Sequence, residues 1–176
     1  SVKRNYSKAK ESYEKAAELN NHKAAFNLGY IYAKGKGVQQ DYKKAKEYFE
    51  KAAELGSKRA LNNLGYLYEK GYAVEQNYSK AKECYEKSLE AGFSESLISI
   101  GLLYSRGYGV EKDLNKTKEF FEKAFESNDA NTLFHLGKLY ERSDDEFEPD
   151  YKKAKKCYEK ATDLGNPKAL YNLGLL

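Results

Sequence analysis

Residues that interrupt helices are scarce in this sequence, while residues that favour helices are common. Proline occurs only twice among 176 residues, whereas tyrosine occurs 17 times and lysine and glutamate are plentiful. No apolar run approaches the about 18 residues that a transmembrane helix requires, and residues 1–20 contain no apolar core of a signal peptide. The composition therefore predicts a helical protein with a large surface and no membrane insertion.

Groups that perform catalysis or bind metals are equally scarce. His22 and His135 are the only imidazoles, and no recurring serine or cysteine accompanies them. We therefore expect no enzyme activity, no metal site and no cofactor. The net charge of +4, from 31 basic and 27 acidic residues, is too mild to indicate nucleic-acid binding by itself.

What the sequence contains instead is a repeat of 36 residues. One track is an apolar-Gly pair, found at Leu28-Gly29, Leu64-Gly65, Ile100-Gly101, Leu136-Gly137 and Leu173-Gly174. A second track is a Tyr-x-Lys-Ala pattern that starts at Tyr6, Tyr42, Tyr78 and Tyr151, with a variant that starts at Leu114. The two tracks predict two helices per repeat, named here helix A and helix B in that order. The loops between them are too short for anything but antiparallel neighbours.

Capping residues predict where these helices begin and end. Residues that tolerate the left-handed conformation of helix C-termini recur at Asn20, Gly56, Gly92, Asn128 and Gly165. N-cap residues for helix A follow at Asn21, Ser57, Ser94, Asp129 and Asn166. We expect one repeat domain over residues 1–176, made of a helix B (6–19), four repeats (22–56, 58–92, 94–128 and 130–165) and a partial helix A (167–176). Because the sequence begins and stops within repeats, we expect a fragment of a longer array.

The glycine inside each helix A predicts unusually close packing. Glycine within a helix costs about 1 kcal/mol relative to alanine, so a recurring glycine needs a compensating gain. The simplest physical account is that helices A and B cross there so closely that a methyl group would clash.

These rows of residues resemble the Sel-one-like repeat (SLR) family, a relative of the tetratricopeptide repeats. The shared pattern is A-x-x-L-G-x-x-Y-x-x-G-x-G-V followed by D-Y-x-K-A and Y-E-K-A, which stands here at residues 25–38 and 41–52, and again from 61 and from 97. The resemblance implies an all-α, right-handed α/α solenoid superhelix of antiparallel helix pairs with about four and a half repeats. The fourth repeat departs from the pattern, because residues 143–149 form an acidic segment that we expect to be a solvated insertion.

One face of each helix A predicts a binding surface. At about 100° per residue, the side opposite the packing face combines aromatic and aliphatic residues with amides and cations, a composition typical of interfaces. The resemblance places this stripe in the concave groove of the superhelix. Its residues are Lys23, Phe26, Asn27, Tyr30, Lys34, Arg59, Asn62, Asn63, Tyr66, Ile98, Leu102, Phe134, Lys138, Tyr171 and Asn172. Alternatively, the rings pack against neighbouring helix A residues and only line the inside of the superhelix.

The leading hypothesis is a protein–protein interaction scaffold or adaptor that binds a peptide or partner segment in this groove. The alternative is a regulatory or spacer arm of a larger enzyme such as a kinase. Nucleic acid is not an expected partner, because Glu precedes Lys by four residues at Glu11, Glu47, Glu83 and Glu119 of helix B, and alternating signs dilute a positive field.

Two further expectations concern the cysteines and the end of the chain. Cys84 and Cys157 occupy equivalent positions two repeats apart, too far for a disulfide, so we expect free thiols and a cytoplasmic location. A lumen of the secretory route is the alternative if a longer parent chain carries a signal. Leu173, Leu175 and Leu176 begin a helix A without a partner helix B, which predicts end-to-end self-association.

Overall fold

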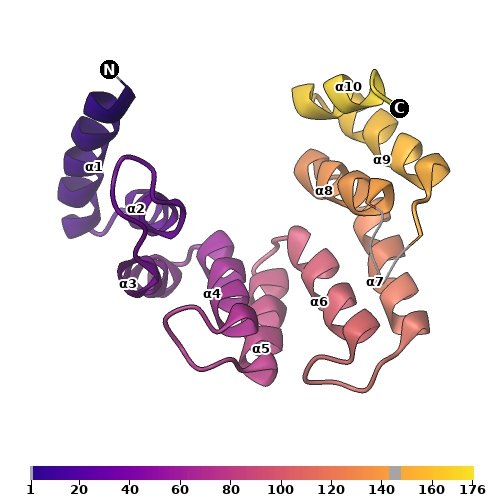
Figure 1. Ribbon diagram of the computed structural model, residues 1–176, viewed down its shortest axis with the longest axis horizontal. Helices are drawn as coiled ribbons and strands as arrows, with labels where there is room; N and C mark the ends of the chain where they lie inside the picture. Colours follow the sequence, from indigo (N-terminus) through magenta and orange to yellow (C-terminus); the bar gives the residue numbers. More distant parts are fainter. Residues whose placement is uncertain (1, 143–147) are drawn as a thin grey trace. The chain divides into compact units, whose positions relative to one another are not determined.

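The computed structural model describes residues 2–142 and 148–176, with side chains described from residue 10 onward. Within these residues the chain forms α-helices and no strand, which confirms the predicted all-α class (Figure 1). The helices are α1 (Val2–Glu18), α2 (His22–Lys34), α3 (Tyr42–Glu54), α4 (Lys58–Lys70), α5 (Tyr78–Glu90), α6 (Glu95–Arg106), α7 (Leu114–Glu126), α8 (Ala130–Glu141), α9 (Tyr151–Asp163) and α10 (Pro167–Leu173). Most of the acidic insertion, residues 143–147, lies outside the described residues.

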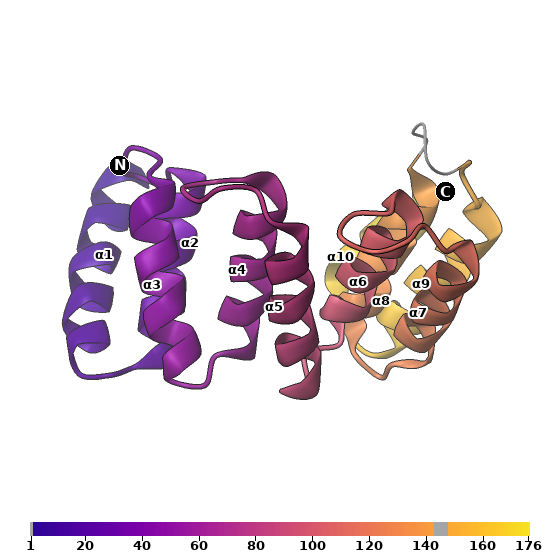
Figure 2. The ribbon, with the colours of Figure 1, turned by 90° about the horizontal axis from the view of Figure 1, so that it is seen from below.

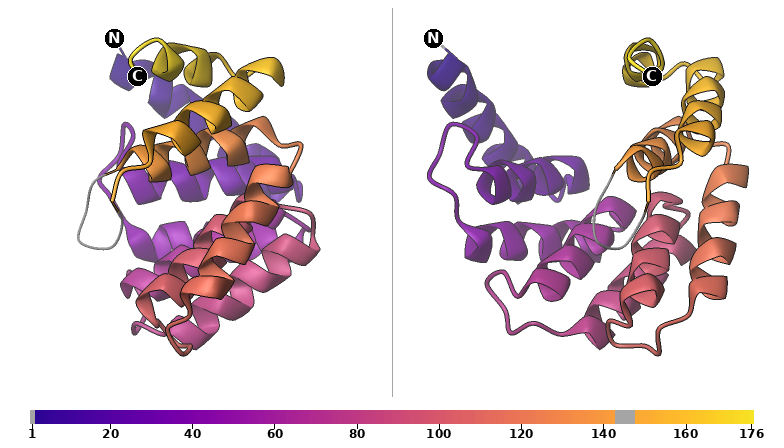
Figure 3. Two further views of the ribbon diagram at one scale, coloured as in Figure 1. Left: turned by 90° about the vertical axis from the view of Figure 1, so that its right-hand side faces the viewer. Right: turned by 45° about the vertical axis from the view of Figure 1, so that its right-hand side comes forward.

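The helices alternate between the two predicted types. Even-numbered helices are helices A and odd-numbered helices are helices B, and each complete helix A makes its most extensive contacts with the helix B that follows it. The chain divides into two compact units, unit 1 (residues 1–93, α1 to α5) and unit 2 (residues 94–176, α6 to α10). Successive helices of unit 1 lie side by side with opposite directions in Figure 2, and α10 of unit 2 lies against α9 in Figure 3. Each unit is therefore a stack of antiparallel helix pairs.

Most of the predicted caps form. The side chains of Asn21, Ser57, Asp129 and Asn166 each accept a hydrogen bond from a backbone N–H in the first turn of a helix A. Two expectations were wrong. Ser94 makes no capping hydrogen bond with its side chain, because its backbone is already helical. Asn128 does not adopt the left-handed conformation, because α7 ends instead in extended backbone at Ser127, whose hydroxyl donates to the carbonyl of Ala124 at 2.7 Å.

The glycines of helices A face aromatic rings of helices B. A Cβ atom added at Gly65 would lie 2.6 Å from Cε1 of Tyr85, far inside van der Waals contact. The same relation holds in the other complete repeats, where the pairs are Gly29 with Phe49, Gly101 with Phe121 and Gly137 with Tyr158. All four rings are at most 4% exposed. This confirms the predicted close crossing of helices A and B. Burial of the aromatic ring supplies the free energy that offsets the cost of a glycine within the helix.

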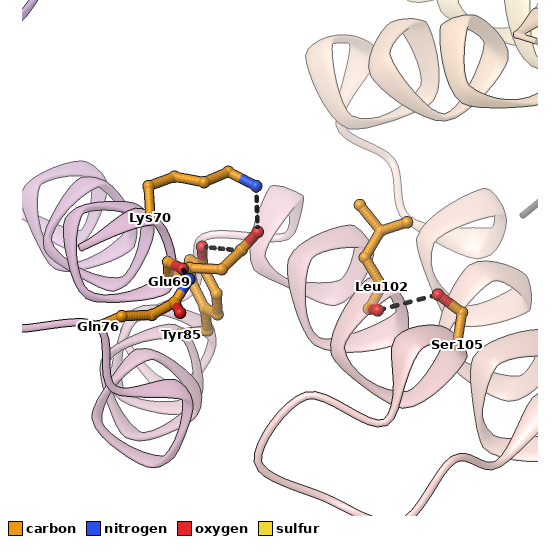
Figure 4. A network of polar contacts seen from close by, with 6 residues as sticks. All are labelled: Glu69, Lys70, Gln76, Tyr85, Leu102 and Ser105. Atoms are coloured by element: carbon orange, nitrogen blue, oxygen red, sulfur yellow. Dashed lines mark hydrogen bonds and ion pairs between the residues drawn. The ribbon is translucent and has the colours of Figure 1, made fainter. Parts of the chain in front are cut away.

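A hydrogen bond between the ring hydroxyl and a glutamate of helix A accompanies the ring in two of the four repeats, with the glutamate buried in unit 1 and half-buried in unit 2. In unit 1 the Tyr85 hydroxyl donates to Oε2 of Glu69 at 2.8 Å, and Oε1 of the same carboxylate accepts from Lys70 at 2.8 Å (Figure 4). In unit 2 the Tyr158 hydroxyl donates to Oε2 of Glu141 at 2.5 Å. Burial, together with the Glu69 carboxylate, raises the pKa of Tyr85, so this phenol stays neutral and acts as a donor.

Candidate functional site

The stripe of unit 1 consists of the outward residues of α2 and α4, and two tyrosines dominate it. Tyr30 is 39% exposed and Tyr66 is 41% exposed, whereas the other large hydrophobic side chains of these helices are buried or half-buried. The charged members Lys23, Lys34 and Arg59 are exposed. The other members, Phe26, Asn27, Asn62 and Asn63, are half-buried. The stripe of unit 1 therefore presents partly exposed rings next to cations and amides.

Cations lie over three aromatic rings of this stripe. The Arg59 guanidinium carbon is 5.1 Å from the centre of the Phe26 ring, and Lys70 Nζ is 5.7 Å from that of Tyr66. Lys36 Nζ lies 4.8 Å from the ring centre of Tyr30. Cation–π attraction holds a side chain in place without neutralising its charge. The charges of Arg59 and Lys36 therefore remain available to a ligand, whereas Lys70 is paired with the Glu69 carboxylate at 2.8 Å.

A cavity of about 480 Å³ lies at one end of the stripe of unit 1, and this α2–α4 cavity is lined from both helices. It brings together four predicted residues, Lys23, Phe26 and Asn27 of α2 and Arg59 of α4. It also includes His22, Gly56, Ser57 and Lys58, which the sequence analysis did not predict. The sequence could have indicated these four residues, because they lie in or just before the first turns of successive helices A. Helical periodicity groups residues on one face of a single helix, so it does not group residues at the ends of two neighbouring helices.

Two predicted residues of α4 are partly engaged within unit 1. Tyr66 contacts the edge of Tyr72 with ring centres 6.0 Å apart, and Tyr72 in turn stacks on Tyr42 at 4.3 Å. Burial against this cluster raises the pKa of Tyr66. The Asn63 amide donates to the backbone carbonyl of Arg59 at 3.0 Å, so one of its donors is used within the helix. Tyr66 is therefore fixed on one side and exposed on the other, as an anchor for a ligand requires.

The stripe of unit 2 is more buried. The expectation that Ile98 points outward was wrong, because its side chain is only 9% exposed and α6 directly contacts α8. Phe134 is half-buried, with its ring centre 6.0 Å from that of Tyr158 on the following helix B, α9, whereas the alternative interpretation expects it against a neighbouring helix A. Leu102 is half-buried and Lys138 is exposed.

The remaining predicted residues lie on α10. Tyr171 is 69% exposed. Asn172 is half-buried, and its amide lies 3.2 Å from the hydroxyl of Tyr158. The structure thus places Asn172 against the neighbouring helix B and leaves Tyr171 open to a ligand.

Some of the charges on helices B are paired along the same helix. Two of the four predicted Glu-to-Lys pairs form, Glu83 with Lys87 at 2.6 Å and Glu119 with Lys123 at 2.5 Å. The pairs expected from Glu11 and Glu47 are replaced by pairs of the opposite order, in which Lys precedes Glu. These join Lys10 to Glu14 and Lys46 to Glu50, and Lys82, Lys118 and Lys155 make equivalent pairs. The face of helices B is therefore a solvated surface of partly compensated charge.

Metal sites, membrane-spanning helices and reactive thiols are other features that the described part of the chain could contain. It contains no group of three or more His, Cys, Asp or Glu side chains arranged to hold a metal ion. Each helix described is too short or too polar to cross a membrane. Cys84 and Cys157 are free, and burial raises the pKa of the Cys157 thiol to about 12. That thiol therefore remains protonated near neutral pH and is a poor nucleophile.

Comparisons with known proteins place the repeats in context. The sequence model described as the Sel1 repeat matches residues 22–57, 58–93, 94–129 and 130–166, and a tetratricopeptide repeat model matches residues 3–23. Among solved structures, a Sel1 repeat protein from Oxalobacter formigenes is 36% identical with a TM-score of 0.68, and the match covers 94% of this chain and 69% of that one. No curated protein matches the sequence.

Two further solved structures share the fold over most of the chain. The protein c5321, a protective antigen present in uropathogenic Escherichia coli strains and displaying an SLR fold, is 30% identical with a TM-score of 0.61; the match covers 95% of this chain and 36% of that one. The immunity protein Pa5087 from Pseudomonas aeruginosa is 25% identical with a TM-score of 0.62, covering 91% of this chain and 59% of that one. Both of these relatives are thus considerably longer than the matched segment.

Proposed function

Because the chain belongs to the Sel1 repeat family, whose helix pairs commonly form protein-interaction scaffolds, we propose that it binds a segment of another protein along α2 and α4 without catalysing a reaction. One observation carries this proposal: Tyr30 and Tyr66, equivalent residues of successive helices A, both remain about 40% exposed. Tyrosine and arginine are the residue types that contribute most to binding energy at protein interfaces. The α2–α4 cavity, which contains Arg59, lies on the same stripe and supplies a concave surface.

The double variant Tyr30→Ala/Tyr66→Ala tests the proposal. We expect binding of the partner to weaken at least about 100-fold, because each truncated ring removes about 1.4 kcal/mol or more of interface energy. The helical content should stay unchanged, since neither ring belongs to the buried core. The measurement begins with affinity capture from the native source and continues with calorimetric titration of the captured partner.

A matched control is Tyr151→Ala on α9, which removes a tyrosine that is 59% exposed at the start of a helix B. This control should bind the partner like the wild type. If the double variant folds normally and also binds like the wild type, the stripe of unit 1 is not the binding surface.

We also propose that the exposed face of α10 pairs with a second copy of the chain. Leu170 is 59% exposed, whereas the equivalent Leu133 of α8 is fully buried against its helix B. At the other end, α1 is a helix B whose main contacts are with the following α2. The α1 of one copy can therefore cover the α10 of another, giving an open, head-to-tail association.

Sedimentation measurements over a range of concentrations test this association. We expect the average mass to rise between about 10 µM and 1 mM, because a small apolar patch supports only weak binding. The variant Leu170→Glu should remain monomeric, while Leu114→Glu, at an equally exposed leucine of α7, should behave like the wild type. A wild-type chain that stays monomeric throughout would rule out self-association.

A further inference from the structure

Positive charge in unit 1 is concentrated on the helices A. Helices α2 and α4 together carry five Lys or Arg residues and a single acidic residue, Glu69. Helices α3 and α5 carry seven basic and six acidic residues. Glu69 is only 6% exposed and already binds Tyr85 and Lys70. The accessible charge on the helix A side of unit 1 is therefore positive.

The α2–α4 cavity concentrates part of this charge. Lys23, Lys58 and Arg59 line it together with His22, and no acidic side chain is among the lining residues that the structure describes. Lys58 donates to the carbonyl of Gly92 at 2.9 Å, which leaves its charge uncompensated. Arg59 lies over the Phe26 ring, which likewise leaves its charge intact. By contrast, helix B lysines of the same unit, such as Lys46 and Lys82, each lie 2.6 Å from a glutamate.

Uncompensated cations gathered in one concave site repel each other, and this repulsion is relieved when an anion binds between them. Arg59 offers a planar fork that matches a carboxylate in bidentate geometry, and Lys23 offers a second, more mobile charge. Asn27 adds an amide within reach of the same space. The cavity volume of about 480 Å³ is within the range of pockets that hold an organic ligand rather than a lone ion.

The distribution of charge favours an acidic peptide over a nucleic acid. A single-stranded nucleic acid is bound along a continuous basic track. The flanking helices B of unit 1 do not continue such a track, because their seven lysines alternate with six glutamates, and Lys46, Lys82 and Lys87 are paired with glutamates. In unit 2 the helices A carry balanced charge, with Glu95 and Arg106 on α6 and Lys138 and Glu141 on α8.

We infer that the α2–α4 cavity recognises the carboxylate side chains of an acidic peptide segment, with Arg59 and Lys23 as the principal contacts. This inference rests on the proposed function, because it specifies the chemistry of the partner segment that the stripe of unit 1 binds. Tyr30 and Tyr66 then contact apolar side chains of the same segment, next to its acidic residues.

A titration of the isotopically labelled full chain, followed by NMR, tests the inference. The probe is a capped tetraglutamate peptide, and a capped tetraglutamine peptide of the same length is its control. We expect tetraglutamate to cause saturable shifts at residues 22–27 and 57–59 with a dissociation constant on the order of 1 mM, weakening as salt is added. Tetraglutamine should cause no saturable shift.

Charge-matched variants separate a specific site from general attraction. Lys23→Gln/Arg59→Gln should weaken tetraglutamate binding at least about tenfold, since it removes both principal contacts. Lys43→Gln/Lys80→Gln removes the same net charge from exposed positions on α3 and α5, and it should change binding less than about twofold. Equal losses in the two double variants would show non-specific attraction and would overturn the inference.

Other outcomes also decide the question. Equal binding of tetraglutamine, or no shift near the cavity with tetraglutamate, would overturn the acidic preference. A tetrauridylate that binds more tightly than tetraglutamate would assign the cavity to nucleic acid. The two proposals fail separately: if Tyr30→Ala/Tyr66→Ala abolishes partner binding while Lys23→Gln/Arg59→Gln does not, the stripe stands and the acidic preference falls.

Discussion

Replacing Gly65 with alanine is expected to destabilise the protein by about 2 kcal/mol or more, although alanine is the better helix former by about 1 kcal/mol. The added Cβ would lie 2.6 Å from Cε1 of Tyr85 and 3.0 Å from the backbone carbonyl oxygen of Ala81. Rotation of the Tyr85 ring cannot relieve the second contact, since it involves the backbone of α5. Helices α4 and α5 must therefore move apart, and the buried ring loses part of its packing.

Gly174→Ala provides a control at the equivalent position of the repeat. The nearest atom to a Cβ at Gly174 is the carbonyl oxygen of Tyr171 at 3.5 Å, an ordinary contact within the same turn. Its backbone is right-handed helical, with φ of −73°, so alanine fits without strain. We expect Gly174→Ala to change stability by less than about 0.5 kcal/mol. Urea denaturation followed by far-UV circular dichroism measures both effects, and equal midpoints for the two variants would contradict the close-crossing account.

The fold was largely predictable from the sequence, because the packing that constrains Gly65 recurs in each complete repeat. The Leu-Gly row, the Tyr-x-Lys-Ala row and the caps each report a local constraint that recurs in every repeat. The Leu-Gly row, for example, predicts a close contact between helix A and helix B, and its recurrence in every repeat supports that prediction. The caps predicted at Ser94 and Asn128 were wrong, because each residue stands where a repeat departs from its neighbours and the cap that forms depends on the local backbone.

The candidate site was less predictable, because it depends on distances between helices. The stripe was assigned by angle around each helix, which says nothing about how near the next helix A lies. In unit 2, α6 and α8 touch and Ile98 is buried. In unit 1, Phe26 of α2 is the equivalent of Ile98, and it lines the α2–α4 cavity. His22 and Lys58 join that cavity from the first turns of their helices, a relation that helical periodicity does not encode.

Two residue types vary together where helix A crosses helix B. The sequence contains this pairing, but only the structure shows that the two residues are in contact. Wherever the buried ring is phenylalanine, the equivalent position near the end of helix A is small, as in Ala33 with Phe49 and Ser105 with Phe121. Wherever the ring is tyrosine, that position is glutamate, as in Glu69 with Tyr85 and Glu141 with Tyr158. A buried phenol needs an acceptor, and a buried carboxylate needs a donor, so the two positions depend on each other.

The double variant Glu69→Ala/Tyr85→Phe is therefore expected to be more stable than either single variant. Glu69→Ala removes the acceptor of the buried Tyr85 hydroxyl, and Tyr85→Phe removes a hydroxyl that donates to Oε2 of a buried carboxylate. Each change should cost about 2 kcal/mol. The double variant reproduces the natural combination of Ala33 and Phe49 and should lose only about 1 kcal/mol, which gives a coupling of about 3 kcal/mol.

A double-mutant cycle by urea denaturation measures this coupling. The matched control is the exposed pair of Glu83 and Lys87 on α5, whose side chains lie 2.6 Å apart and are each about 60% exposed. Its coupling should stay below about 0.5 kcal/mol, because water and salt screen it. If the losses from Glu69→Ala and Tyr85→Phe simply add, the two positions are independent. The alternation of glutamate with tyrosine along the repeats would then have no basis in the stability of the fold.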